Sequence, residues 1–363
     1  MNSVAFYISG HGFGHASRQV EIINAFGRRY PEFGIVVRSA ATRWLLERTI
    51  DVPFTLDARP TDTGVVQLDS LHLDARATMA TAARFYATFD TRIAEDAQVL
   101  RERGVGFVVS DAPPLGCAAA HAAGIASVVV SNFTWDWIYE AYADEHAHAR
   151  EVIETIQSAY ARALAAWRLP MYGDFIPFET VINVPLVARH SGRSPEETRA
   201  HLGLPLDTRL VLSSFGGYGV QSLDLDRVQL PAGWEMVRGL EEAEIYDAGL
   251  SYQDLVRAVD VVVTKPGYGI VSECIANETA IVYTSRGVFP EYDVFVREMP
   301  RYLQCAYISN DDLLAGRWRD AIDTAVSAPA PPEQPRTNGA EVLADMIAAC
   351  LPGASSFPPR ASP

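Results

Sequence analysis

Short apolar runs alternate along this chain with longer segments whose apolar residues recur at helical spacing. The first run, Val4–Ser9, leads into a glycine-rich turn, and a helical pattern follows from about His15 to Arg29. The same order recurs at Gly34–Arg38, and again through Gly106–Ser110, Pro113–Ala123 and Ala126–Val130. Strands that are apolar along their whole length and are separated by helices predict a parallel sheet covered on both faces.

A second series of the same kind follows a break in the pattern. Between Leu164 and Leu206 the chain contains Pro- and Gly-rich segments, which we interpret as a crossing between domains. The alternation then resumes at Arg209–Ser214, Trp234–Val237, Tyr252–Ala258, Asp260–Thr264, Tyr268–Ala276 and Ala280–Thr284. A chain of 363 residues exceeds the roughly 100–200 residues of one ordinary domain. We therefore expect Rossmann-like domains at 1–190 and 191–335, a helix in 336–351 that packs back toward the N-terminal domain, and a flexible tail at 352–363.

Charge and composition narrow the classes of partner. The formal net charge is −15, from 30 basic and 45 acidic residues, and no Lys/Arg-rich run is present, so nucleic acid is not an expected partner. No stretch approaches the roughly 20 apolar residues of a membrane span, and the N-terminus lacks the basic region of a signal peptide. We expect a cytoplasmic protein without a transmembrane segment. The four cysteines form no metal-ligand motif and are expected to be reduced. The sequence says little about oligomeric state.

The first glycine-rich turn, from Gly10 to His15, lies between a predicted strand and helix. Ligands bind at this edge of open α/β sheets, and Gly12 and Gly14 allow the backbone to approach a ligand closely. A histidine such as His15 can take a proton from an attacking hydroxyl. A dinucleotide fingerprint fits less well, because the spacing is not GxGxxG. A histidine that only stabilises the turn remains an alternative.

Asp111 follows the strand Gly106–Ser110 at the same predicted edge. A carboxylate there could orient the His15 imidazole and stabilise it once it is protonated. Asp111 is equally well placed to cap the helix predicted at Pro113.

Aromatic residues are concentrated between Ser131 and Tyr139. Aromatic faces suit sugar rings or apolar acceptors, which makes Asn132, Trp135 and Trp137 candidate acceptor-binding residues. Packing beneath the site is an alternative role for them. We expect the rest of the acceptor pocket in the segments Asp57–Asp74 and Tyr139–Trp167, and the sequence does not identify the acceptor.

Two glycine-containing loops follow strands in the second half of the chain. Together they predict a backbone nest for a diphosphate, with a helix dipole, a cation at Lys265 and a ribose-hydroxyl acceptor at Glu273. The donor-binding candidates from the loops of both halves are Gly12, Gly14, Ser214, Gly216, Gly217, Lys265, Gly267, Tyr268, Gly269, Ser272 and Glu273.

These motifs resemble one known family over nearly the whole chain. They are SGHGFGHASRQVEII, VSDAPPLGCAAAHAAGIASVVVSNFTWDWIYEAY, VINVPLVAR, SSFGGYG, KPGYGIVSECIANETAIVY and TNGAEVLADMI. The chain is similar to the glycosyltransferase-like N-terminal half of plant L-arabinokinases and to stand-alone microbial relatives. More distantly it resembles inverting GT-B glycosyltransferases that use UDP-sugars. The resemblance implies an α/β GT-B fold, with two Rossmann-like domains facing across a cleft.

The resemblance also implies roles for individual residues. By position, His15 matches the catalytic base of the GT-B enzymes and Asp111 its carboxylate partner. Lys265 falls where the plant enzymes have a phosphate-binding histidine, and Glu273 falls on their ribose-binding glutamate. The implied reaction is metal-independent, inverting transfer of a sugar from a nucleotide-sugar co-substrate to a hydroxyl acceptor, with no other cofactor.

One part of the donor signature departs from that family. The signature ends in an acid–glutamine pair that contacts donor hydroxyls, whereas this chain has Glu291 and Asp293, shifted by about two residues and without a glutamine. The departure leaves the donor sugar open. Alternative functions are a non-catalytic sugar-nucleotide-binding module, a GT-B sugar-nucleotide epimerase and a Rossmann dehydrogenase.

Overall fold

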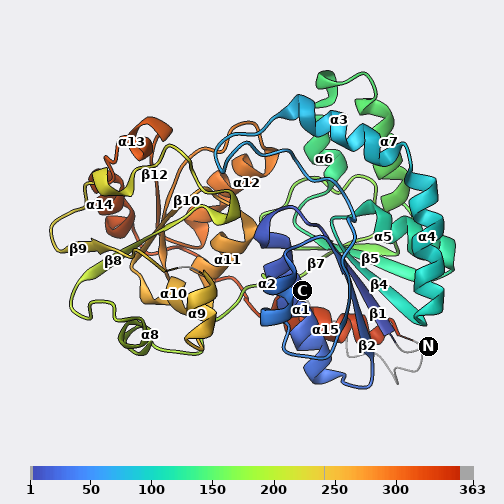
Figure 1. The fold of residues 1–363 in the computed structure, drawn as a ribbon, viewed down its shortest axis with the longest axis horizontal. Helices are drawn as coiled ribbons and strands as arrows, with labels where there is room; N and C mark the ends of the chain where they lie inside the picture. The colour runs from blue at the N-terminus through green and yellow to red at the C-terminus, as the bar shows by residue number, and fades with distance from the viewer. Residues whose placement is uncertain (1–2, 241, 352–363) are drawn as a thin grey trace. The chain divides into compact units, whose positions relative to one another are not determined.

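The structure is a computed structural model that describes residues 3–240 and 242–351. These residues form two compact units, one of 3–64, 75–187 and 338–351, and one of 65–74 and 188–337 (Figure 1). Neither unit is continuous in sequence, unlike the expected domains 1–190 and 191–335. The tail expected at 352–363 lies outside the described residues.

The first unit is built on a seven-stranded sheet in the order β3-β2-β1-β4-β5-β6-β7, in which every neighbouring pair is parallel. Chain order reverses between β1 and β4, which is the switch point where ligands bind in folds of this order. The strands are β1 (Ser3–Ile8), β2 (Gly34–Ser39), β3 (Thr55–Asp57), β4 (Val105–Asp111), β5 (Ala126–Ser131), β6 (Ala165–Arg168) and β7 (Val181–Asn183).

Helices cover this sheet, and the last helix of the chain returns to it. Helix α15 lies beside α1 (Figure 1), where Arg29 donates to Asp345 from Nε and Nη2, each over 2.9 Å, and Tyr30 donates to the same carboxylate over 2.7 Å. The helices are α1 (Gly12–Arg29), α2 (Arg43–Thr49), α3 (Ala75–Tyr86), α4 (Phe89–Glu102), α5 (Pro114–Ala123), α6 (Trp135–Glu140), α7 (Ala149–Tyr160) and α15 (Gly339–Ala349).

The second unit is built on a five-stranded parallel sheet in the order β12-β11-β10-β8-β9. Its switch point lies between β8 and β10. The strands are β8 (Arg209–Ser214), β9 (Trp234–Met236), β10 (Val261–Thr264), β11 (Ala280–Tyr283) and β12 (Cys305–Tyr307). The helices are α8 (Pro195–Leu202), α9 (Glu242–Asp247), α10 (Tyr252–Ala258), α11 (Tyr268–Ala276), α12 (Pro290–Glu298), α13 (Asn310–Leu314) and α14 (Arg319–Ser327).

Residues 65–74 pack within the second unit, although the residues on both sides of them belong to the first. This segment, which we call the inserted hairpin, pairs Gln67 with Leu73. Leu71 is 1% exposed and lies in the core cluster of the second unit. Ser70 donates its N–H to the Gly219 carbonyl over 3.0 Å and its hydroxyl to the Phe215 carbonyl over 2.5 Å. Burial of a leucine contributes roughly 1.5–3 kcal/mol. Leu71 and the two Ser70 hydrogen bonds therefore favour a place in the second unit for this part of the expected acceptor loop.

The structure corrects two expectations about where elements begin. Helix α1 starts at Gly12 rather than about His15, so Gly12, Gly14 and His15 lie in its first turn. Burial of Ala16, Val20 and other residues of this helix outweighs the low helix propensity of the two glycines. Strands β6 and β7 occupy part of the stretch that we interpreted as a crossing. β6 pairs with β5 and β7 pairs with β6, which extends the first sheet into this stretch.

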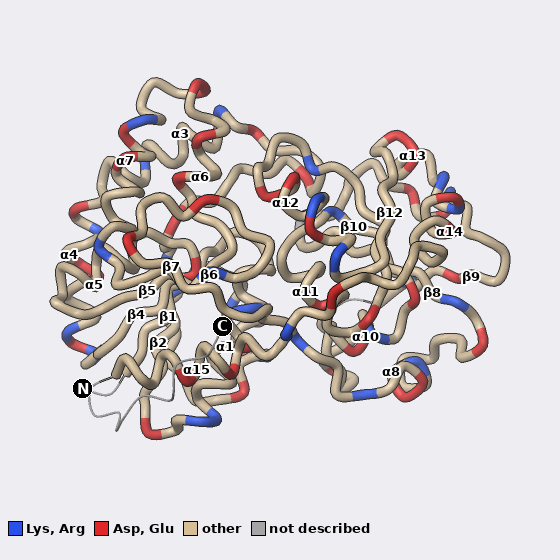
Figure 2. The backbone as a smooth tube through the Cα atoms, turned by 180° about the vertical axis from the view of Figure 1, so that it is seen from behind, with Lys and Arg blue, Asp and Glu red and all other residues tan. Residues whose placement is uncertain are grey.

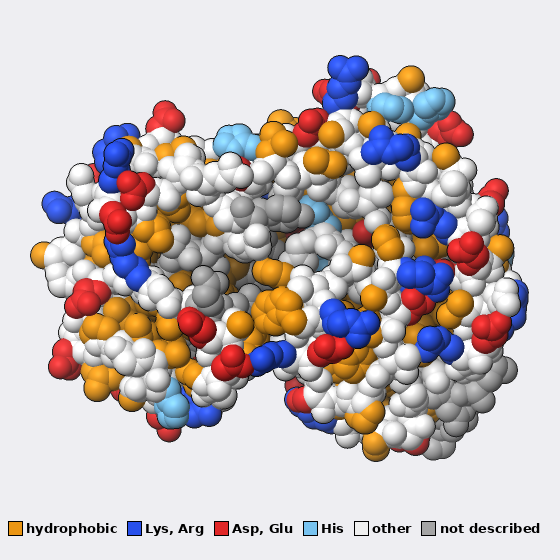
Figure 3. Space-filling model, in the orientation of Figure 1, with side chains coloured by type: hydrophobic (Ala, Val, Ile, Leu, Met, Phe, Trp, Pro, Cys, Tyr) orange, Lys and Arg blue, Asp and Glu red, His pale blue; other side chains and the backbone are white. Residues whose placement is uncertain are grey.

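Charges of both signs are interspersed along the backbone (Figure 2). On the face drawn in Figure 3, basic side chains alternate with acidic ones and do not gather in one broad patch. None of the helices in 3–240 and 242–351 combines the length and the apolar character needed to cross a bilayer.

Candidate functional site

His15, Arg18 and Asp111 form a buried cluster at the carboxyl end of the first sheet. His15 lies in the first turn of α1, Arg18 one turn later, and Asp111 ends β4. His15 Nδ1 lies 3.0 Å from Asp111 Oδ1. Arg18 donates from Nε to Asp111 Oδ2 over 2.6 Å and from Nη2 to Asp111 Oδ1, which makes a bidentate pair. The exposed fractions of His15, Arg18 and Asp111 are 5%, 3% and 0%.

This geometry excludes one of the two roles considered for Asp111. Helix α5 has Pro113 as its N-cap and no side-chain cap, so the capping role is wrong. The Asp111 carboxylate binds Arg18 and His15 instead. Burial alone would raise the pKa of Asp111, but the charges of Arg18 and then His15, with their hydrogen bonds, hold it below its ordinary value.

The count of hydrogen atoms favours one tautomer of His15. Nη2 of Arg18 carries two hydrogens, and both have oxygen acceptors, Asp111 Oδ1 and Ser131 Oγ at 3.0 Å. The 2.9 Å approach of Nη2 to His15 Nδ1 therefore needs no third hydrogen. On this count Nδ1–H donates to Asp111, and Nε2 of His15 is left as an acceptor.

Residues that follow β5 contact the His15–Arg18–Asp111 cluster. Asn132 accepts from Arg18 Nη1 over 2.6 Å and donates to the Met171 carbonyl over 3.3 Å. Trp135 is fully buried, and its ring lies 6.2 Å from that of His15. Of the three predicted acceptor residues, Asn132 and Trp135 are thus buried with partners, whereas Trp137 is partly exposed.

A second buried carboxylate, Asp62, lies in this region. Ser9 Oγ donates to its Oδ1 over 3.1 Å, and Trp135 Nε1 donates to its Oδ2 over 2.8 Å. Burial raises the pKa of Asp62 to about 6, even though Ser9, His15 and Trp135 act to lower it. Gly64 follows with φ +57°, and a Cβ there would lie 2.7–2.8 Å from the His11 side chain, so only glycine fits.

Two loops of the second unit leave the carboxyl ends of β8 and β10. Gly216 and Gly217 lie in an exposed turn after β8, and Gly216 has φ +68°. Gly267 is the N-cap of α11, in extended conformation, with no side chain to cap the helix. The first backbone N–H groups of α11 therefore have no side-chain cap from this residue, which is the arrangement that suits an anion.

The polar side chains predicted in these loops already have partners. Ser214 Oγ lies 2.5 Å from the Tyr252 hydroxyl, and Ser272 Oγ donates to the Gly269 carbonyl over 2.9 Å. Tyr268, the first residue of α11, is 4% exposed. The backbone of these loops is consequently better placed than these side chains to bind a ligand.

Glu273 is buried in α11 and paired with Arg189. Arg189 donates from Nε over 2.8 Å and from Nη2 over 2.5 Å, and both bonds end on Glu273 Oε1. Burial raises the pKa of Glu273, although Arg189 acts in the opposite direction. The pair fixes the orientation of this carboxylate.

The two acidic residues of the altered signature differ in exposure. Both lie in the first turn of α12. Glu291 is 5% exposed, with Oε2 3.5 Å from Nη1 of the buried Arg286, whereas Asp293 is exposed. Arg286 also donates to the Pro266 carbonyl over 3.3 Å, next to Lys265.

The sequence analysis did not predict four charged residues of these clusters. Arg18 lies within the first quoted motif and Arg189 within VINVPLVAR, but nothing in one sequence pairs them with Asp111 and Glu273. Asp62 and Arg286 stand in loops without a recognisable pattern. Within 3–240 and 242–351, no three His, Cys, Asp or Glu side chains gather as a metal ion would require.

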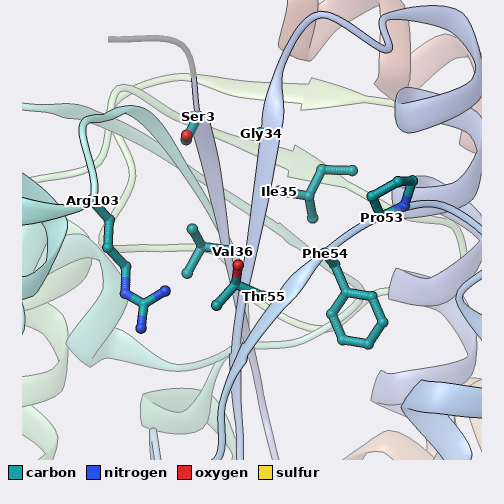
Figure 4. A pocket seen from close by; sticks show the side chains of 8 residues that line it. All are labelled: Ser3, Gly34, Ile35, Val36, Pro53, Phe54, Thr55 and Arg103. Atoms are coloured by element: carbon teal, nitrogen blue, oxygen red, sulfur yellow. The ribbon is translucent and has the colours of Figure 1, made fainter.

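A separate hollow of about 350 Å³ lies at the opposite end of the first sheet (Figure 4). Its lining includes Ser3 and Gly34, the first residues of β1 and β2, together with Phe54 and Arg103. The catalytic candidates lie at the carboxyl ends of these strands, so this hollow is not part of the candidate site.

Comparison with known proteins identifies a sequence relative of this chain. No known protein-family profile matches it. Over 356 residues, 94% of this chain, it is 34% identical to L-arabinokinase from Arabidopsis thaliana. The chain spans about a third (34%) of the length of that relative. The resemblance to L-arabinokinase expected from the motifs is confirmed.

Solved glycosyltransferases share the whole architecture. The calicheamicin glycosyltransferase CalG4 matches with a TM-score of 0.62 and 12% identity, over 98% of this chain and 100% of its own. The glycosyltransferase of kitacinnamycin matches with a TM-score of 0.61 and 15% identity, over 97% and 99%. This chain has the GT-B fold. UGT2 of Phytolacca americana, solved with UDP-2-fluoroglucose and pterostilbene, has the same fold, with a TM-score of 0.55, 11% identity and coverage of 96% and 94%.

The GT-B fold accounts for the position of the candidate residues. Each of its two parallel sheets has a switch point, between β1 and β4 and between β8 and β10. His15 and Asp111 flank the first, and the glycine loops and Lys265 flank the second. The expected fold class is therefore confirmed, and the functions of these residues remain to be proposed.

Proposed function

We propose that this protein is a glycosyltransferase that moves a sugar from a nucleoside-diphosphate donor to a hydroxyl acceptor with inversion at the anomeric carbon. The observation that carries the proposal is the hydrogen bond between His15 Nδ1 and Asp111 Oδ1, 3.0 Å, at the switch point of the first sheet. A UDP-sugar is the favoured donor, in keeping with the motif resemblance and with the UDP-sugar analogue bound to UGT2 of Phytolacca americana.

His15 acts as the base in this proposal. Its Nε2 takes the proton of the acceptor hydroxyl while the oxygen attacks the anomeric carbon and the bond to the diphosphate oxygen breaks. Asp111 stabilises the imidazolium that results, and Arg18 holds the carboxylate in place through two hydrogen bonds. Both partners of His15 are buried, so the geometry needs little reorganisation during the reaction.

The second unit holds the donor. Backbone groups of Gly216 and Gly217, the N-terminus of α11 and Lys265 bind the diphosphate and stabilise its charge as it leaves. Glu273, oriented by Arg189, accepts hydrogen bonds from the ribose through Oε2, the oxygen to which neither Arg189 bond is directed. We propose that the reaction proceeds without a metal ion.

Nucleotide binding and turnover are the properties to measure first. We expect one of UDP, dTDP and GDP to raise the melting temperature, because a ligand that binds only the native state stabilises it. Glu273→Gln should reduce this stabilisation without abolishing it, and His15→Gln should keep it in full while losing release of UDP from UDP-sugar with an acceptor. The exposed His148→Gln serves as the matched control and should retain both. Turnover that requires a divalent cation after EDTA treatment would contradict metal independence.

The bidentate Arg18–Asp111 pair also favours a second candidate function. Because Arg18 already neutralises the Asp111 carboxylate, that carboxylate stabilises an imidazolium less than an unpaired one would. A module that binds a sugar nucleotide without turnover is therefore the alternative. Stabilisation by a nucleotide with no UDP release and no epimerised sugar, across a panel of acceptors, would favour this module over the transferase.

A further inference from the structure

Lys265 is the only lysine in a chain with 30 basic residues. It follows β10 in the loop that leads to α11, and its side chain is partly exposed. Among the residues that the structure describes, none makes a hydrogen bond or salt bridge with its ammonium group. Every other basic position of the sequence, histidines aside, is arginine. The amine at this position is therefore a chemical difference from those arginines.

Amine and guanidinium groups differ in their ability to lose a proton. Arginine stays charged at any pH that a protein experiences, whereas a lysine that is partly desolvated can become neutral. Three charged residues act on Lys265, each from a different element: Arg286 before α12, Glu291 in α12 and Asp69 in the inserted hairpin. Burial, and after it the positive charge of Arg286, lower the pKa of Lys265 well below its ordinary 10.5, against the two carboxylates.

The surroundings of Lys265 suit an anion. Arg286 is 6% exposed and is held by Glu291 and by the Pro266 carbonyl, so it is a fixed positive charge beside the amine. The N-terminus of α11, two residues away, adds a positive dipole end. Arg286 and the N-terminus of α11 oppose a second positive charge at Lys265, whereas Glu291 and Asp69 favour it. A bound diphosphate would add two more negative groups and favour the charged amine.

We propose that Lys265 is neutral in the empty donor site and takes up one proton when the donor diphosphate binds. The inference rests on the proposed function, because it concerns the same donor site. The proton comes from the solvent and converts the amine to an ammonium group beside the diphosphate. It returns to the solvent when the nucleoside diphosphate leaves.

Isothermal titration calorimetry with UDP tests this coupling. Titrations at one pH in two buffers of different ionisation enthalpy give the number of protons exchanged. At about pH 8, where a terminal phosphate with a pKa of about 6 is already ionised, we expect uptake of up to one proton per UDP. The dissociation constant should rise with pH by up to tenfold per unit. Lys265→Arg should bind UDP without uptake, because its charge is permanent, and Lys265→Met should bind more weakly, also without uptake.

A unique lysine permits a second measurement on the unmodified protein. An amine-acylating reagent at about pH 8 should modify Lys265 faster than a lysine in a model peptide, and UDP should protect it. Peptide mass spectrometry separates Lys265 from the N-terminal amine.

The outcomes separate this inference from the proposed function. Binding of UDP without proton exchange would overturn the coupling and leave the donor site standing. Uptake that persists in Lys265→Met would assign the proton to another group and overturn the inference as well. If UDP, dTDP and GDP all fail to bind, the proposed function fails and the inference fails with it.

Discussion

Replacement of Arg18 by methionine tests whether a buried guanidinium holds the His15–Asp111 pair. Arg18 binds both oxygens of Asp111 and also Asn132 and Ser131. Removal of one partner from a buried ion pair costs about 3–5 kcal/mol, because the remaining charge is uncompensated. We expect the free energy of unfolding of the first unit to fall by about 4 kcal/mol, from a typical total of about 5–15. At about 2–4 °C per kcal/mol, its melting temperature should fall by about 8–16 °C.

The pH dependence of this loss has a definite sign. In the native protein the pKa of Asp111 lies below its ordinary value, so its contribution to stability is present above the unfolded-state pKa of about 3.9 and is lost as pH falls through the lower folded pKa. Without Arg18, burial dominates and raises the pKa of Asp111. The loss of stability in Arg18→Met should therefore be largest near pH 7 and should become smaller toward about pH 5.

Thermal and urea unfolding, followed by circular dichroism at both pH values, measures these effects. Arg29→Met is the matched control on the same helix, because the Arg29–Asp345 pair is about half exposed and should be worth less than about 1 kcal/mol. The double variant Arg18→Met/Asp111→Leu should be more stable than Arg18→Met alone, since it removes the uncompensated charge. The reasoning is refuted if Arg18→Met costs no more than Arg29→Met, or if the second substitution lowers stability further.

Three shorter predictions concern other buried groups. Leu71→Ala should lower the stability of the second unit by about 2–5 kcal/mol in urea denaturation, whereas Leu68→Ala on the same hairpin, 63% exposed, should change it by less than about 0.5 kcal/mol; equal effects would contradict the anchoring role of Leu71. Because the pKa of Asp62 is raised to about 6, the native protein should lose stability as pH rises from about 4 to 6, and melting curves of Asp62→Asn should lack this component. Lys265→Met should raise the melting temperature near pH 7, since the empty site disfavours a charge there, and a lower value would show that the ammonium group stabilises the fold.

The sequence predicts the strands at the centre of each sheet well. Expected runs such as Gly106–Ser110 and Asp260–Thr264 match β4 and β10 to within one residue. These strands are covered on both faces, so their residues are continuously apolar and stand out from the surrounding sequence. Strands β3, β6, β7 and β12 were not predicted. These strands have three or four residues and lie at or near a sheet edge. Fewer of their side chains are buried there, so they show no continuous apolar run in the sequence.

The candidate site is predicted only in part, for a physical reason. Residue type and position after a strand suffice to suggest His15, Asp111 and Glu273 as neighbours of the sheet edges. Their partners Arg18 and Arg189 lie 93 and 84 residues away in sequence, and only the fold brings them together. The inserted hairpin is hidden in the same way. Burial of Leu71 and the hydrogen bonds of Ser70 hold it in the second unit, and no local pattern carries that information.

The arginine partners also explain why the two buried carboxylates have opposite pKa shifts, and this yields a last test. Asp111 accepts on both oxygens, whereas both Arg189 bonds reach Oε1 of Glu273, whose pKa is raised. A ribose hydroxyl that donates to Glu273 Oε2 would favour the ionised form, so donor binding should release a proton as Glu273 ionises. Lys265 should take one up at higher pH. The net proton exchange with UDP should therefore change sign as pH rises, and Glu273→Gln should remove the release while it leaves any uptake. Uptake alone at every pH would show that the donor does not act on Glu273.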